Sequence, residues 1–157
     1  MDRRIATTQA QVKLLEDLVS PVPGEDYALF DTKQKALMFA AALGFHLRRS
    51  PSLTARDASA AIRFDIFEKA MDDGFVAALA VSSRGELGIL AEAREDELAQ
   101  LFEEYASAGL SELQSRVLGQ VDPLQALIAV MGEARFPQDE PGLEGLDQSV
   151  LADLLGR

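Results

Sequence analysis

The sequence predicts a mainly α-helical fold, a compact helical bundle around a buried central helix at about residues 32–47. Every residue from Ala36 to Phe45 is apolar, and a helix that is apolar on all sides is expected to be buried on all sides. Apolar residues recur at helical spacing in three further segments, near residues 12–19, 98–105 and 124–131. The length of 157 residues is that of one ordinary domain.

The first two helices are defined by their ends. Thr7 or Thr8 is a suitable N-cap for the first helix, and the prolines in residues 20–24 end it. Asp31 or Thr32 is expected to cap the central helix, which ends at residues 48–51, where two arginines suit the negative end of the helix dipole.

The middle of the chain carries the only β-type pattern. Residues 62–67 alternate apolar and polar side chains, which predicts a short strand or, equally, the start of a helix that runs to Met71. Residues 86–90 are expected to be a short extended segment, so the sequence allows a minor strand pair formed by 62–67 and 86–90. Between them, residues 75–81 are expected to form a short buried helix.

The C-terminal half is expected to hold three helices. A long amphipathic helix begins at Glu92 and ends near Gly109, because glycine often takes the left-handed position that follows a helix. Residues 111–119 are expected to form a separate helix, and Asp122 followed by Pro123 is a strong start for the last one.

Two segments are expected in the domain organisation. Residues 1–134 form a single helical domain. Residues 135–157 are an acidic linker rich in Pro and Gly, followed by a short C-terminal helix.

The composition excludes most catalytic chemistry. There is no Cys, and His46 is the one histidine, so a cysteine nucleophile, a disulfide framework and a multi-histidine metal site are all absent. No glycine-rich phosphate loop and no G-x-S-x-G nucleophile motif occurs. We therefore expect a protein that is not an enzyme, with no catalytic residues, no cofactor and no metal. No apolar run approaches the roughly 20 residues of a membrane helix, so we expect a cytoplasmic protein that does not bind membranes.

Charge is distributed unevenly along the chain. Residues 1–67 contain nine Lys or Arg and eight Asp or Glu, a net charge of +1, whereas residues 68–157 contain six and eighteen, a net charge of −12. Such asymmetry is either a solvated surface or two faces for two partners. The candidate contacts with DNA or a partner are the basic residues Lys33, Lys35, Arg48, Arg49 and Arg56. The candidate acidic partner face is formed by Glu95, Asp96, Glu103 and Glu104, on the expected outer side of the long helix.

Two segments carry a family resemblance. The first is Phe30 to Lys33 together with the run Ala36 to Phe45, and the second is the run Leu101 to Ala106 with Gly109 and Leu110; Phe67 and Asp72–Asp73 lie between them. In this order, over roughly residues 27–130, they resemble the family of the fourth DNA-phosphorothioation (Dnd) system-associated protein. The resemblance implies a setting beside bacterial DNA-modification and antiviral defence genes, and it implies no active-site residue.

Three functions agree with these observations. The first is a non-enzymatic accessory or adaptor subunit of a bacterial anti-phage or DNA-modification system, which binds a larger protein of that system. The second is a DNA-contacting or regulatory module that uses the basic residues. The third is an acidic inhibitor that imitates nucleic acid. Helices with small-residue faces also pack against a second copy of the chain, so a homo-oligomer stays open.

Overall fold

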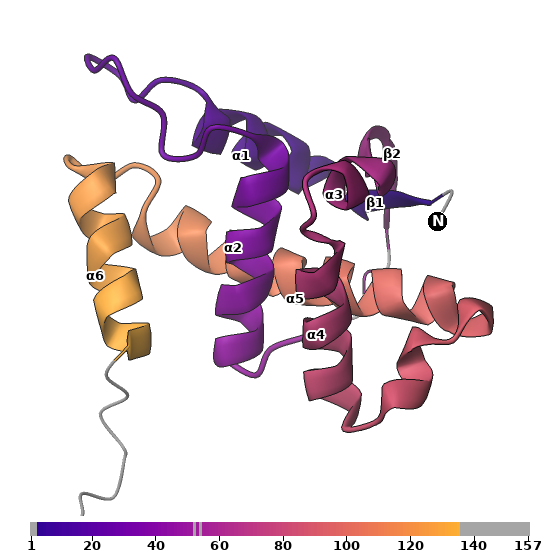
Figure 1. The fold of residues 1–157 in the computed structure, drawn as a ribbon. Helices are drawn as coiled ribbons and strands as arrows, with labels where there is room; N and C mark the ends of the chain where they lie inside the picture. Colours follow the sequence, from indigo (N-terminus) through magenta and orange to yellow (C-terminus); the bar gives the residue numbers. More distant parts are fainter. Residues whose placement is uncertain (1–2, 52, 54, 136–157) are drawn as a thin grey trace, which may run out of the picture.

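The computed structural model describes residues 3–51, 53 and 55–135, and it has a mainly helical fold, as the sequence predicts (Figure 1). None of its helices is long and apolar enough to span a membrane, within the described residues. The elements, in order, are β1 (Arg4–Thr7), α1 (Gln9–Val19), α2 (Lys33–His46), β2 (Asp57–Arg63), α3 (Asp65–Lys69), α4 (Asp73–Arg84), the 3-10 turns η1 (Leu87–Leu90) and η2 (Glu92–Arg94), α5 (Glu95–Arg116) and α6 (Pro123–Arg135). The predicted tail begins at Arg135, the last residue of α6, and its remaining residues, 136–157, lie outside the described residues, so the division into a domain of residues 1–134 and a tail of 135–157 stays a prediction.

Helix α2 lies where the sequence predicts the central helix. The Thr32 side chain caps it by accepting a hydrogen bond from the backbone N–H of Lys35, at 3.2 Å. Its burial is incomplete, however, because Ala42 and Phe45 are exposed. The prediction that this helix is buried on all sides is therefore wrong: one face of α2 remains uncovered along its C-terminal half.

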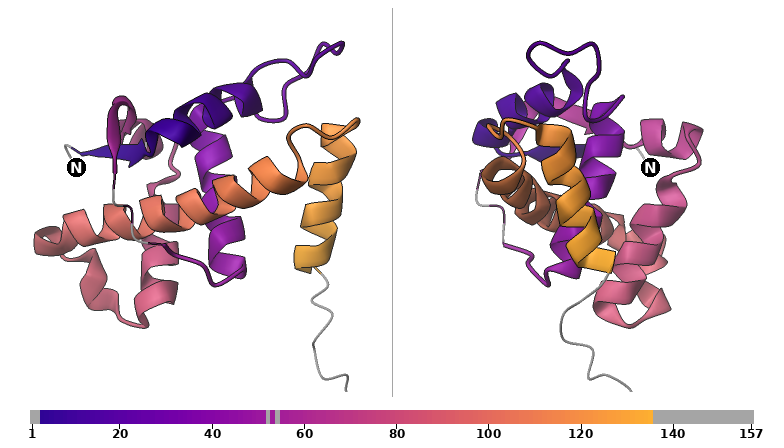
Figure 2. Two further views of the ribbon diagram at one scale, coloured as in Figure 1. Left: turned by 180° about the vertical axis from the view of Figure 1, so that it is seen from behind. Right: turned by 90° about the vertical axis from the view of Figure 1, so that its left-hand side faces the viewer.

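Helix α5 is buried on every side in its middle part. It is one continuous helix through residues 95–116, and all ten residues from Leu101 to Leu110 are buried. The predicted break at Gly109 and the separate helix at 111–119 are both wrong. Figure 2 shows α5 running across the molecule, with α1, α2 and α4 around it.

Two glycines explain why α5 continues through residue 109. Where α2 crosses α5, a Cβ atom at Gly109 would overlap the backbone carbonyl of Ala40, and a Cβ atom at Gly44 would overlap the carbonyl of Tyr105. The glycines are needed for this close approach of two backbones, and not as helix ends. The α2–α5 crossing is the centre of the fold.

The sheet has two antiparallel strands, β1 and β2. Arg4 pairs with Arg63 and Ile5 pairs with Ile62, so that both isoleucines face the core. Of the segment 62–67, only Ile62 and Arg63 lie in a strand, at the end of β2, and residues from Asp65 onward form α3, so the strand prediction is wrong for most of the segment and the alternative of a short helix is confirmed. The expected partner strand at 86–90 is wrong, because those residues form the 3-10 turn η1, which buries Ile89. The actual partner comes from the N-terminus, where three buried side chains follow Arg4 in a strand too short to show a period of two.

Two helices end in an uncommon conformation. Arg48 follows α2 with φ 54°, and Met71 follows α3 with φ 60°. At α2, the N–H of Arg48 donates to Phe45 and the N–H of Arg49 donates to Gly44, both at 3.0 Å, which is the hydrogen-bond pattern of a Schellman motif. Glycine is the usual residue at this left-handed position, and another residue there costs about 1 kcal/mol.

Candidate functional site

Helix α6 carries apolar side chains on more than one face. Leu127 and Val130 point into the core and are buried, whereas Leu124, Ile128 and Met131 are 40%, 50% and 51% exposed. The exposed three follow the i, i+4, i+7 spacing of a single helical stripe. No charged residue occurs from Pro123 to Gly132, although a surface helix ordinarily has a charged outer face.

A shallow groove runs between α6 and the uncovered face of α2. It has a volume of about 260 Å³. Its lining is apolar apart from one histidine and consists of Phe39, Ala42, Leu43, His46, Val130, Met131 and Ala134. Figure 2 shows that α6 stands at the end of α5, beside α2. The groove therefore continues the exposed stripe of α6 onto α2.

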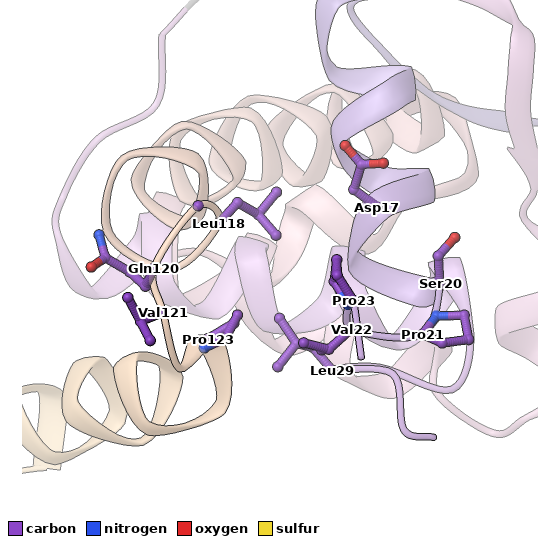
Figure 3. A pocket seen from close by; sticks show the side chains of 11 residues that line it. Asp17, Ser20, Pro21, Val22, Pro23, Leu29, Leu118, Gln120, Val121 and Pro123 are labelled. Carbon is purple, nitrogen blue, oxygen red and sulfur yellow. The ribbon is translucent and has the colours of Figure 1, made fainter. Parts of the chain in front are cut away.

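A second hollow lies at the N-terminal end of α6 (Figure 3). The segment after α1 faces the α5–α6 connection across it, and its volume is about 450 Å³. Pro21, Pro23 and Pro123 stiffen its walls, and Val121 on its rim is fully exposed. We call the stripe of Leu124, Ile128 and Met131, with Val121 and the α2 groove, the α6 surface.

The candidate basic residues do not form one patch. Lys33 and Lys35 lie at the start of α2, whereas Arg48 and Arg49 lie past its other end. A helix of 14 residues is roughly 21 Å long, so the two groups are separate. Arg56 lies in the connection before β2, over α5.

Most of these cations are neutralised within the chain. Their ion pairs are Lys33 with Glu16 at 3.5 Å, Lys35 with Asp31 at 2.8 Å, Arg49 with Glu112 at 3.4 Å and Arg56 with Glu103 at 2.7 Å. The hydrogen bond from Lys35 lowers the pKa of Asp31. Among the residues that the structure describes, Arg48 is the one candidate cation without an ion pair.

Half of the predicted acidic face is inside the protein. Glu103 is 2% exposed and Glu104 is 9% exposed, so these two residues are not part of an outer face. The prediction fails because α5 is covered on all sides at this point, by β1, α1, α2 and α4. Glu95 is half-buried and Asp96 is exposed beside Arg3, with which it forms an ion pair.

Glu103 has a structural role. Its Oε1 accepts a hydrogen bond from the backbone N–H of Ala6 at 2.8 Å, where the pairing of β1 with β2 is irregular. Its Oε2 lies 2.7 Å from the Arg56 guanidinium. Burial raises the pKa of Glu103, against the opposing effects of the Ala6 hydrogen bond and the Arg56 charge. This carboxylate therefore holds the small sheet on α5.

No arrangement typical of a metal site is seen in residues 3–51, 53 and 55–135, since no three His, Asp or Glu side chains gather there as ligands would. The α6 surface offers mainly apolar contact area, with the imidazole of His46 in its groove. An exposed apolar stripe without charged residues has the composition found at the centre of many protein interfaces.

Sequence reasoning did not single out the α6 surface. The helical spacing identifies Leu124, Leu127, Ile128 and Met131 as apolar positions, but it does not tell which of them face solvent. The sequence does contain one signal, which is that the run from Pro123 to Gly132 has no charged residue although the chain as a whole has a net charge of −11.

The comparisons with known proteins support the resemblance. The sequence matches the family described as DNA sulphur modification system-associated protein 4 over residues 4–149. This match is longer than the resemblance over residues 27–130, and it includes the N-terminal strand. Neither a curated protein nor a solved structure matched. The family match spans nearly the whole chain, and the protein therefore belongs to the family of DNA sulphur modification system-associated protein 4.

Proposed function

We propose that this protein is a non-enzymatic accessory subunit of a bacterial DNA sulphur modification system, and that it acts in the cytoplasm by binding a larger protein of that system through the α6 surface. The observation that carries the proposal is the exposed, charge-free stripe on α6. Family membership supports the setting, because the family is named for its association with that system.

The geometry favours an amphipathic helix as the part of the partner that binds. The stripe from Leu124 to Met131 extends over about two helical turns, roughly 10 Å. The groove beside it, between α2 and α6, provides a second apolar wall. An apolar ridge of residues at i, i+3 or i+4, and i+7 on a partner helix would fill such a groove.

A pair of variants on α6 tests the proposal. We expect Ile128→Asp to weaken co-purification with the products of the neighbouring modification genes by at least about tenfold, because it places a charge in the centre of an apolar contact. Since Ile128 is 50% exposed, we expect the free energy of unfolding to fall by about 1 kcal/mol or less. The measurement is a tagged pull-down, with the captured gene product identified by mass spectrometry.

Ala129→Asp is the matched control. Ala129 is exposed on the same helix and points about 100° away from Ile128 around the helix axis. It should retain the partner. Equal capture by both aspartate variants would show that α6 is not the docking site, whereas loss of self-association by Ile128→Asp would identify a second copy of the chain as the occupant.

The alternative of a DNA-contacting module receives little support from the basic cluster. Four of its five residues, Lys33, Lys35, Arg49 and Arg56, already have acidic partners within the chain. A cation that is paired in the free protein must exchange that partner for phosphate, which reduces the gain on binding.

A further inference from the structure

A polar hollow of about 460 Å³ lies where the C-terminal end of α2 approaches α4 and α5. Of the five candidate basic residues, the one that lines this hollow is Arg48, which has no ion pair with any described residue. Its lining residues are Phe45, His46, Arg48, Ser82, Ser83 and Tyr105. None of the six is acidic, although the chain carries a net charge of −11.

The side chains around this hollow carry hydrogen-bond donors and include the aromatic rings of Phe45 and Tyr105. Ser83 Oγ and Tyr105 Oη are 2.8 Å apart and share a hydrogen bond, while Ser82 is exposed beside them. Arg48 is exposed and has no ion pair with any described residue. The hollow thus combines an uncommitted guanidinium with hydroxyl groups and an imidazole.

The backbone conformation places Arg48 at this hollow. With φ 54°, it occupies the position after α2 at which glycine is most frequent. A side chain held in a sparsely populated backbone conformation points to a role other than stability. Met71 adopts the same conformation after α3 but is 87% exposed and does not line this hollow, and it therefore provides an internal comparison.

The dipole of α2 opposes an anion at this end of the helix. Two features reduce that opposition. The carbonyl groups of Gly44 and Phe45 already accept hydrogen bonds from the N–H groups of Arg49 and Arg48, and the Arg48 guanidinium adds a full positive charge.

We propose that this hollow binds the phosphate group of a nucleotide. Arg48 would hold two phosphate oxygens through its planar pair of N–H groups, the geometry in which arginine recognises phosphate. Ser82 and His46 would donate further hydrogen bonds. The Phe45 ring is 36% exposed and packs edge-on against Tyr105, at 5.4 Å between ring centres, so its free face is available to stack on a base.

The test is a calorimetric titration of the full chain with inorganic phosphate, adenosine, AMP and a short single-stranded oligonucleotide. We expect phosphate and AMP to bind and adenosine alone to bind more weakly than AMP. Arg48→Gly should weaken phosphate and AMP by at least about tenfold, since a charge-assisted hydrogen bond is lost. Phe45→Ala should weaken AMP more than phosphate.

The folding control is part of the design. Arg48→Gly relieves the left-handed arginine and should raise the Tm by about 2–4 °C, so its loss of binding is not a loss of folding. Met71→Gly should raise the Tm similarly and bind AMP as the natural chain does. Ile128→Asp should also bind AMP normally, which separates this proposal from the proposed docking on α6.

The outcomes divide clearly. If the natural chain binds AMP and Arg48→Gly does not, the result supports the site. Tighter binding of the oligonucleotide than of AMP identifies nucleic acid as the source of the phosphate. Tighter binding of AMP identifies a free nucleotide. No binding of phosphate or AMP, or equal binding by Arg48→Gly, overturns the proposal.

Discussion

Replacing Gly109 by alanine should destabilise the protein by about 3 kcal/mol, at the upper end of the range for overpacking a core. The added Cβ atom would overlap the backbone carbonyl of Ala40 where α2 crosses α5. Neither helix can move aside easily, because α5 is buried on all sides from Leu101 to Leu110. Denaturant unfolding followed by circular dichroism measures the change.

Gly74→Ala is the control for this prediction. Gly74 also lies within a helix, α4, but nothing stands within 4 Å of a Cβ atom at that position. It should therefore be neutral or stabilise the protein by up to about 1 kcal/mol, from helix propensity alone. If Gly109→Ala were as stable as Gly74→Ala, the close α2–α5 crossing would be wrong.

Replacing Glu103 by alanine should cost about 2–4 kcal/mol of unfolding free energy. The change leaves the Ala6 N–H without its acceptor and Arg56 without its buried partner. The Arg56 side chain is 35% exposed, so it can regain water, which keeps the cost below that of a fully buried pair. Glu92→Ala, at an exposed site, should change stability by no more than about 0.5 kcal/mol.

The pH dependence of Glu103 has a definite sign. Burial raises its pKa in the folded protein above the ordinary value of 4.5, so the folded state binds its proton more tightly than the unfolded state. The part of the stability that comes from holding this proton is then fully present below pH 4.5 and is lost as the pH rises through the folded pKa. Glu103→Gln does not titrate, so the difference in unfolding free energy between the natural chain and this variant should move in favour of the variant as the pH rises. A flat difference would contradict the burial of this carboxylate.

Three carboxylates with a lowered pKa should act in the opposite direction. Hydrogen bonds from Lys35 and Lys69 lower the pKa of Asp31 and Asp65, and a hydrogen bond from Arg116 lowers that of Glu133. Their contributions are present above the unfolded pKa and are lost as the pH falls. For this reason the effect of Glu103 must be measured as the difference in unfolding free energy between the natural chain and Glu103→Gln.

The sequence predicts helices well where local signals agree. Thr32 caps α2 as expected, and Asp122 accepts a hydrogen bond from the N–H of Gln125 at the start of α6, at 2.9 Å. These features depend on neighbours in the chain. Gly109 shows the limit of such reasoning, because the same residue that ends many helices is used here for a contact with Ala40, 69 positions away in the sequence.

The candidate site was less predictable for the same reason. Glu103 and Glu104 belong to an acidic run, and nothing in their spacing shows that β1 and α1 cover them. Ile128 and Leu127 are equivalent as apolar residues, and only the placement of α6 at the end of α5 exposes one and buries the other. Which cations are paired also depends on contacts distant in sequence, as between Arg56 and Glu103.

The most direct test of the proposed function is a pull-down of the tagged natural chain from cells that carry its neighbouring modification genes, with and without nuclease. We expect the same larger gene product to be captured in both samples and to resist high salt, because the contact on α6 is apolar. Capture that vanishes with nuclease would show that nucleic acid bridges the two proteins. Release by salt alone would favour an acidic surface that imitates nucleic acid, and either result would contradict docking through α6.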